Sequence, residues 1–278
     1  MLENLNNYFY PTSLKEALKN LKEPNSRPIA GGTALTLIKD SSTQALVDLS
    51  GLNLSYINDT KKEFQIGALT SSYEIAFHAL LPQSLKDCAR KIGDVPLIHA
   101  VTIGGNISDI YPWSDYPCVL LALGASITVY NIETGKPENF TADEYFEKFR
   151  KTKPGLVTEI KIPKSVKNSS DYYQKYTYTI VEKSQANLAT YFEWNDQKEI
   201  TKATVVVSAV TKFPQRVKSV EKMITGQKIT PDLVEKYQKE ISSSIEAIPN
   251  FKTSREYRKE IIGVYLKRAL EKCQQEVQ

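Results

Sequence analysis

The sequence predicts an α+β protein of two parts, and three observations lead to that prediction. The first part opens with a compact βαβ-like unit and continues with mixed strands and helices to about residue 165. A polar stretch, residues 164–171, then separates the two parts. The second part has its strands first and its helices after them, an order typical of an α+β layer.

Local start and stop signals define the elements of the first part. Ser13–Glu16, Ser71–Glu74 and Thr141–Glu144 have the spacing of a capping box, so each is expected to open a helix. Apolar residues at helical spacing predict further helices, and alternation of apolar and polar residues predicts strands. Residues 118–123 are expected to form a buried segment. The expected helices are 14–21, 33–39, 71–80 and 82–92, and the expected strands are 27–30, 44–49, 63–67, 125–130 and 156–162.

The second part reads as three strands followed by three helices. The strands are expected at 172–179, 188–194 and 203–210. Pro231 stands at the first position of the middle helix, and Gly226 ends the helix before it. The three helices are expected at 217–225, 230–244 and 254–273.

Composition narrows the function classes. The chain has 278 residues, 41% of them hydrophobic, and 36 Lys and Arg against 32 Asp and Glu give a net charge of +4 without a basic run. This balance does not indicate nucleic-acid binding, and no apolar run approaches the ~20 residues of a membrane helix. The N-terminus lacks the features of a signal peptide, so we expect a cytoplasmic protein.

Histidine and cysteine are too few for most metal and nucleophile chemistry. The chain has three cysteines, none in C-x-x-C spacing, and two histidines. We therefore expect free thiols that are buried or half-buried, and no metal site or catalytic triad on this chain. An enzyme so poor in nucleophiles and bases borrows its chemistry from a cofactor, so no catalytic side chain is expected here beyond that cofactor.

Two Gly-Gly pairs are the candidate cofactor site. One lies in the stretch Ile29, Ala30, Gly31, Gly32, Thr33, Ala34 and Leu35, and the other in Thr102-Ile103-Gly104-Gly105-Asn106. Glycine reaches positive φ and lets backbone N–H groups approach a ligand, and consecutive N–H groups can form an anion-binding nest. A single such pair is usually only a turn. Together, two nests could hold the two phosphates of a dinucleotide.

Five landmarks in order resemble the FAD-binding medium subunit of the molybdenum hydroxylases, the family of xanthine dehydrogenase and CO dehydrogenase. Ala30–Leu35 is similar to the family's A-G-G-T/H-x-L loop, and Thr102–Asn106 with Tyr111–Asp115 to its T-I-G-G-N and following acidic stretch. The remaining landmarks are Pro117–Ala125, then Pro214-Gln-Arg216 with Glu221 and Gly226, and Ser254–Arg258. His99-Ala100 and Glu182–Asn187 depart from the family pattern, which leaves the electron acceptor open.

The resemblance implies a fold and a domain division. It implies a two-lobed FAD-binding domain of the PCMH (vanillyl-alcohol-oxidase-like) type at 1–165, with lobes 1–56 and 57–165. It also implies a CO-dehydrogenase-flavoprotein-type C-terminal domain at 170–278, a three-stranded antiparallel sheet with helices.

The resemblance also implies roles for single residues. Both glycine segments would bind the FAD pyrophosphate, with Thr33 and Thr102 adding hydroxyl contacts. Asn106 would contact the phosphate or ribityl chain, and Asp115 would anchor the cofactor, although Asp115 also suits a helix N-cap. Val157 would meet the flavin edge and Lys175 would lie near the ring, although a strand core position and a solvated lysine are the ordinary alternatives.

The function that follows is electron transfer within a complex. The chain would be the flavoprotein subunit of an oxidoreductase, and would receive electrons from a partner subunit with 2Fe-2S clusters, itself supplied by a molybdopterin subunit. NAD is the expected acceptor. A non-catalytic FAD-binding scaffold, or a subunit of a related reductase, are the alternatives. A self-contained flavin oxidase is disfavoured by the scarcity of His and Cys.

Overall fold

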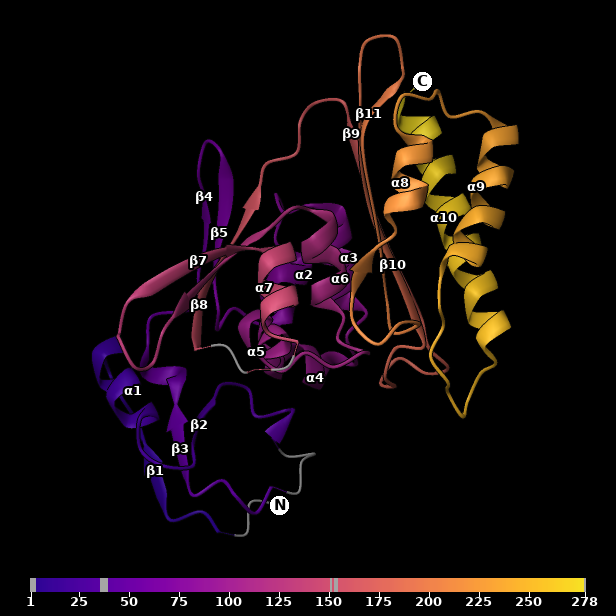
Figure 1. The fold of residues 1–278 in the computed structure, drawn as a ribbon. Coiled ribbons are helices and arrows are strands. Elements are labelled where there is room, and N and C mark those ends of the chain that lie inside the picture. Colours follow the sequence, from indigo (N-terminus) through magenta and orange to yellow (C-terminus); the bar gives the residue numbers. More distant parts are fainter. Residues whose placement is uncertain (1–3, 36–39, 151, 153–154, 278) are drawn as a thin grey trace.

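The computed structural model describes residues 4–35, 40–150, 152 and 155–277, and these form three sheets with helices between and around them (Figure 1). The N-terminal lobe lies at the lower left of Figure 1, the second lobe at the centre, and the C-terminal domain at the right. Each sheet is built from one continuous part of the chain.

The N-terminal lobe contains a parallel sheet of order β1-β3-β2. Its strands are β1 (Asn7–Phe9), β2 (Ser26–Ile29) and β3 (Ala45–Asp48). Helix α1 (Leu14–Leu21) begins at Ser13, whose hydroxyl accepts from the Glu16 N–H, while the Glu16 carboxylate accepts from the N–H of Thr12. The parallel pairing of β2 and β3 confirms the two strands of the predicted βαβ-like unit. The expected helix 33–39 lies mostly outside the described residues, and Thr33 and Ala34 form a turn.

The second lobe is built on an antiparallel sheet of order β4-β5-β8-β6-β7. The capping boxes at Ser71 and Thr141 are both formed, as expected. The strands are β4 (Ile57–Asp59), β5 (Glu63–Gly67), β6 (Ser126–Tyr130), β7 (Pro137–Thr141) and β8 (Leu156–Pro163). The helices are α2 (Ser72–Phe77), α3 (Gln83–Arg90), α4 (Val95–Ala100), α5 (Ile103–Ser108), α6 (Tyr116–Ala122) and α7 (Ala142–Lys148).

The C-terminal domain has an antiparallel sheet of order β12-β11-β10-β9. The three expected strands are present as β9 (Ser169–Tyr176), β10 (Ala186–Trp194) and β11 (Ile200–Ser208). The expectation of three strands is corrected to four, because β12 (Gln215–Arg216) adds a two-residue edge to β11. The helices are α8 (Lys218–Ile224), α9 (Pro231–Ser244) and α10 (Arg255–Val277).

The four-stranded sheet lies between two helical layers, and this joins the C-terminal domain to the second lobe (Figure 1). One face packs on α8 and α10, and the opposite face packs on α3 and α6. Tyr173, Ala189 and Val206 on that opposite face belong to the same buried cluster as α6. The second lobe and the C-terminal domain therefore share one continuous core.

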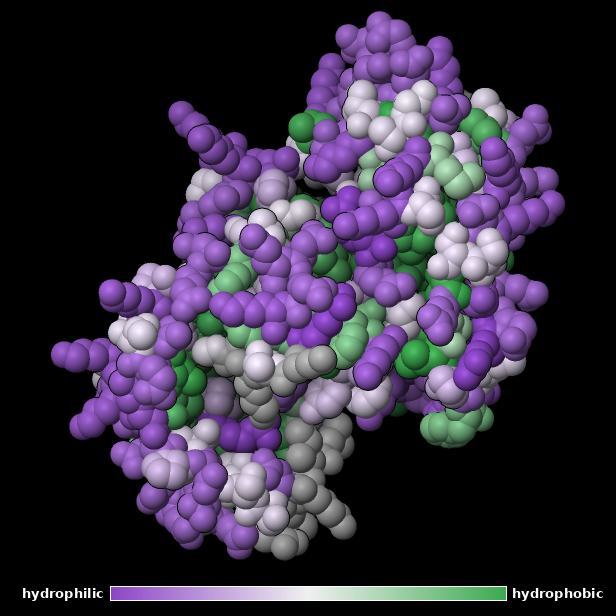
Figure 2. All heavy atoms as spheres, in the orientation of Figure 1, coloured by the Kyte–Doolittle hydropathy of each residue, from purple (hydrophilic) through white to green (hydrophobic). Residues whose placement is uncertain are grey.

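Polar side chains cover most of the surface seen in Figure 2, with apolar residues visible mainly in its recesses. In the part of the chain that the structure describes, no helix is both long and apolar enough to cross a membrane.

Candidate cofactor-binding site

The first glycine segment is a surface turn whose backbone donors are available. It follows β2 directly, and Gly32 has a φ of 70°, in the left-handed region. Among the described residues, the N–H groups of Gly31 and Gly32 donate to no acceptor. Neighbouring N–H groups left free in such a turn suit a bound anion. The local conformation thus fits the phosphate-binding role expected for this segment.

A close backbone approach brings the two glycine segments together. A Cβ atom on Gly31 would lie 1.6 Å from the carbonyl oxygen of Ala100. Ala100 is the last residue of α4, and only Val101 separates it from Thr102, where the second segment begins. The absence of a side chain at Gly31 is therefore what permits this contact. Two stretches about 70 residues apart in sequence meet at one place.

The second segment differs from its expected form. It is the N-terminus of α5, with Thr102 as the N-cap and its hydroxyl oxygen 3.2 Å from the N–H of Gly105. Gly104 and Gly105 are not among the residues with positive φ, so the expectation of a second left-handed nest is wrong. Glycine is required at 104 for space, because a Cβ there would lie 2.5 Å from the Cβ of Ala68.

The donors of this second segment are mostly used within the protein. The N–H of Gly104 donates to the Ala68 carbonyl oxygen at 2.9 Å, and the N–H of Ile103 donates to Thr70 at 3.0 Å. At this end of α5, the groups available to a ligand are the Thr102 hydroxyl and the Gly105 N–H, which donate and accept between themselves in this structure. The first segment thus supplies free backbone donors and the second a hydroxyl-capped helix start.

Asn106 and Asp115 connect this region to the rest of the fold. The Asn106 side-chain oxygen accepts from the N–H of Tyr116 at 3.3 Å, at the start of α6. Asp115 occupies the N-cap position of α6, but its side chain makes no capping hydrogen bond, so the N-cap alternative for its carboxylate is wrong. The Asp115 carboxylate points instead toward the C-terminal domain.

Four side chains of the C-terminal domain converge on Asp115. One carboxylate oxygen accepts from the Tyr173 hydroxyl at 2.9 Å, the Ser184 hydroxyl at 2.7 Å and the Asn187 amide at 3.3 Å. The other carboxylate oxygen lies 3.4 Å from the ammonium of Lys175. The side chains of Lys175 and Asp115 are only 2% and 9% exposed. A buried charge needs such pairing, so this network stabilises both ionised groups.

The register of the sheet explains why these groups meet. Lys175, Asn187 and Ser208 lie opposite one another on β9, β10 and β11, on the face toward α6. The Asn187 amide also donates to the Ser208 hydroxyl at 3.1 Å. In the neighbouring row the residues are Tyr173, Ala189 and Val206, which belong to the shared core. Burial raises the pKa of Tyr173, and the Asp115 carboxylate raises it further, so this hydroxyl stays protonated and donates.

Val157 lies inside the core, and the residue after it is linked to the second glycine segment through Ala68. It is 4% exposed and pairs with Val129 across β8 and β6. The carbonyl oxygen of the next residue, Thr158, accepts from the Ala68 N–H at 2.9 Å, and the Ala68 carbonyl oxygen accepts from Gly104. The remaining predicted residues stay on or beside the first turn: Ile29 ends β2, Ala30, Thr33 and Ala34 are half-buried, and Leu35 is buried.

Sequence reasoning missed several members of this site. Tyr173, Ser184 and Asn187 hold Asp115, and Arg27 of β2 forms ion pairs beside the first turn. A signal existed only for Asn187, which interrupts an otherwise apolar run, Ala186-Asn187-Leu188-Ala189. The other members become recognisable only when the strands are placed in register.

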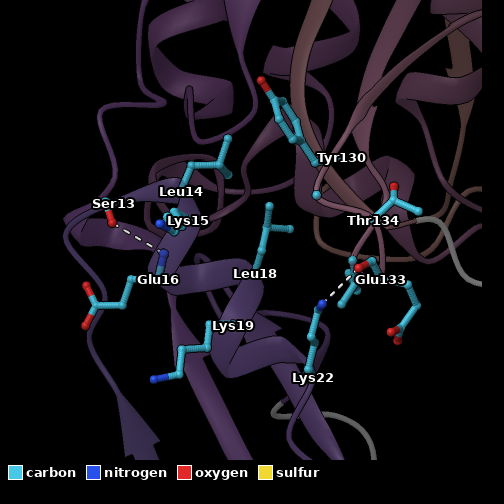
Figure 3. Close-up of a pocket in the computed structure, with 12 residues that line it drawn as sticks. Ser13, Leu14, Lys15, Glu16, Leu18, Lys19, Lys22, Tyr130, Glu133 and Thr134 are labelled. Atoms are coloured by element: carbon cyan, nitrogen blue, oxygen red, sulfur yellow. Dashed lines mark hydrogen bonds between the residues drawn. The ribbon is translucent and has the colours of Figure 1, made fainter.

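The hollow drawn in Figure 3 is separate from this site. Its volume is about 700 Å³, and it lies between α1 and the turn that joins β6 to β7. Leu14, Leu18 and Tyr130 form its apolar wall, and the Lys22 ammonium donates to the Glu133 carbonyl oxygen at 2.8 Å. None of the predicted cofactor-binding residues lines it.

The structure also bears on metal binding. Within the described ranges, no three His, Cys, Asp or Glu side chains group as ligands for a metal ion. Cys88, Cys118 and Cys273 are free and buried, which confirms the expectation for the thiols.

The fold joins two α+β parts, and comparison with known proteins identifies the class as an FAD-binding domain followed by a flavoprotein C-terminal domain. Residues 3–165 match the family described as FAD binding domain in molybdopterin dehydrogenase, and residues 173–273 match the CO dehydrogenase flavoprotein C-terminal domain. The chain belongs to this molybdopterin dehydrogenase family, as its flavoprotein subunit.

Individual relatives align over nearly their full length. The glyceraldehyde dehydrogenase medium chain of Sulfolobus acidocaldarius is 30% identical over 273 residues, covering 94% of this chain and 96% of that protein. The carbon monoxide dehydrogenase medium chain of Afipia carboxidovorans is 25% identical, covering 96% of both. A solved CO dehydrogenase structure from Hydrogenophaga pseudoflava superimposes with a TM-score of 0.90 at 20% identity, covering 99% of both chains, which shows that the fold is shared.

Proposed function

We propose that the chain is the FAD-binding electron-transfer subunit of a molybdopterin-dependent hydroxylase or dehydrogenase complex. A molybdopterin subunit supplies electrons to the iron–sulfur clusters of a second partner subunit. This chain receives the electrons from those clusters and passes them to NAD or another acceptor. The names of the relatives, medium chains of dehydrogenases, support an assembly with further subunits. Cytoplasmic localisation and the limits of the two domains belong to the same proposal.

The observation that carries the cofactor site is the meeting of the two glycine segments. The free N–H groups of Gly31 and Gly32 face no protein acceptor among the described residues, and Gly31 packs on the carbonyl of Ala100 next to Thr102. We assign the diphosphate of FAD to this place, held by those N–H groups and by the hydroxyl of Thr102. Asn106, also at this place, orients the adjoining part of the cofactor.

The flavin end is assigned to the side of Lys175 and Val157. FAD, when bound, supplies the capacity to accept single electrons and release them as pairs. Asp115 holds the Lys175 ammonium in place, and Tyr173, Ser184 and Asn187 hold Asp115. A fixed ammonium favours negative charge on a neighbouring group without the cost of reorganisation. Val157, whose side chain is buried in β8, is assigned to meet the flavin edge.

The experiment that tests this function uses the purified full chain. Acid should release FAD rather than FMN from the protein, and anaerobic mixing with NADH should bleach the flavin absorbance. Gly31→Val is the negative control. It should not bind FAD, because a branched side chain cannot fit against Ala100. A protein that cannot be loaded with FAD contradicts the proposal. If the protein retains FAD but NADH does not reduce it, the acceptor is a molecule other than NAD, or the chain has the scaffold role.

A further inference from the structure

An arginine of β2 joins the segments that carry the two glycine pairs. Arg27 places one guanidinium nitrogen 3.0 Å from the Asp40 carboxylate and another 3.2 Å from the Asp109 carboxylate. Arg27 lies four residues before Gly31, on the strand that leads into the first turn. Asp109 is the C-cap of α5, the helix whose N-terminus is the second segment. The planar guanidinium fork therefore bridges the two halves of the site.

This bridge is well formed for an ion pair near the surface. The side chain of Arg27 is 16% exposed, and those of Asp40 and Asp109 are 18% and 28% exposed. Asp40 is itself fixed, because its carboxylate also accepts from the hydroxyls of Ser42 at 2.5 Å and Thr43 at 2.7 Å. An arginine shared between two carboxylates ties together the chain segments that carry them.

The bridge also matters for charge. A diphosphate placed at the two glycine segments would lie in the same region as two carboxylates. The hydrogen bonds from Ser42 and Thr43 hold the pKa of Asp40 well below its ordinary value, so its carboxylate is ionised at neutral pH. Arg27 is the cation paired with both carboxylates, so it screens their charge from an anionic ligand.

We propose that Arg27 is a positioning residue that fixes the spacing of the two glycine segments. It thereby makes the site selective for a dinucleotide over a mononucleotide. This inference rests on the proposed function, because it takes the two segments to be the diphosphate site. The Gly31–Ala100 contact fixes the approach of the segments at one point, and the Arg27–Asp109 pair fixes it at a second. A ligand with two phosphates spans both segments, whereas one phosphate needs only one of them.

The test compares the binding of FAD and FMN to the full chain, by quenching of flavin fluorescence. Arg27→Met should weaken FAD binding about tenfold or more, the loss expected for charge-assisted hydrogen bonds. FMN binding should change less than about twofold, so the FAD-to-FMN preference falls. Asp109→Asn, from the opposite end of the bridge, should shift the preference in the same direction. Lys202→Met, which breaks the exposed pair with Glu193 on the C-terminal sheet, is the control and should shift nothing.

Two further variants separate spacing from charge. Arg27→Lys keeps the charge but lacks the fork, so it should restore FAD binding only in part. Arg27→Met combined with Asp109→Asn removes one charge of each sign, and it should remain as weak as Arg27→Met. Full recovery in this double variant would overturn the spacing role, as would equal weakening of FAD and FMN in Arg27→Met. If Arg27→Met keeps wild-type FAD binding, the inference alone fails, whereas a wild-type chain that does not bind FAD removes the proposed function and the inference together.

Discussion

Substituting Gly31 by alanine tests the packing on which the cofactor site depends. A methyl group at this position would lie 1.6 Å from the Ala100 carbonyl oxygen and 2.6 Å from its carbonyl carbon, whereas ordinary contacts begin at 3.4 Å. The turn and the end of α4 must separate by up to about 1.8 Å (3.4 minus 1.6), and both sides of the contact are backbone. Forcing a methyl group into such a place costs about 1–3 kcal/mol.

Most of that cost should appear in FAD affinity and not in folding. The first turn is exposed at Gly31, so its displacement should disturb little of the buried core, whereas the diphosphate that we propose to bind here would require the original spacing. A cost of about 1–3 kcal/mol corresponds to about 5-fold to 150-fold weaker binding. FAD titration followed by flavin fluorescence measures this loss, and thermal melting of the ligand-free protein measures any change in stability.

Gly135→Ala provides the matched control. Gly135 has a φ of 67° in the turn between β6 and β7, and a Cβ there would meet no atom within 4 Å. The control variant should lose about 1–2 kcal/mol of stability from its left-handed backbone while its FAD affinity stays unchanged. An FAD dissociation constant for Gly31→Ala within about twofold of the wild type would refute the packing argument.

Three other predictions follow from the buried groups and from Asp40. Lys175→Met leaves the Asp115 carboxylate buried without its cation, so the free energy of unfolding measured in urea should fall by about 3–5 kcal/mol. The exposed control Lys202→Met should lower it by less than about 1 kcal/mol. Burial raises the pKa of Cys118 and of Cys273 to about 12, so a thiol reagent at about pH 8 should label no cysteine in the folded protein and all three in denaturant. The pKa of Asp40 is lowered from its ordinary 3.8, so its contribution to stability is present above about pH 4 and is lost as the pH falls further; the difference in urea midpoint between wild type and Asp40→Asn should shrink from about pH 6 to about pH 2.

Elements with local signals could be predicted from the sequence. The capping box at Ser71 is formed at the start of α2, and strand 63–67 coincides with β5, because both depend on residues only a few positions apart. At Ser13 the helix starts where expected and the Ser13 hydroxyl accepts from the Glu16 N–H, but the Glu16 carboxylate accepts from the N–H of Thr12 instead of the N–H of Ser13. Helix α2 stops at Phe77, three residues before its expected end. The expected end is wrong because the sequence signals for a helix end are weaker than those for a helix start.

Elements that depend on tertiary contacts were not predictable. Strands β1 and β4 have three residues each, too few for a periodic pattern, and exist because β3 and β5 supply their hydrogen bonds. The second glycine pair suggested a turn, since glycine disfavours helices. It is helical because Thr102 caps α5 and because only glycine fits against Ala68 at position 104. The space that a neighbour leaves overrides the local propensity of these residues.

The pairing of Asp115 with Lys175 shows where residue-by-residue resemblance stops. The resemblance implied a separate cofactor contact for each, and the two are 60 positions apart in the sequence. Their contact depends on the place of α6 against the sheet and on a β9–β10 register that puts Asn187 opposite Lys175. Shifting this register by one residue would turn Lys175 toward α10 and leave Asp115 without its cation. Any influence of Lys175 on a bound flavin is therefore a property of the ion pair, because a carboxylate 3.4 Å away already offsets part of the charge of the ammonium.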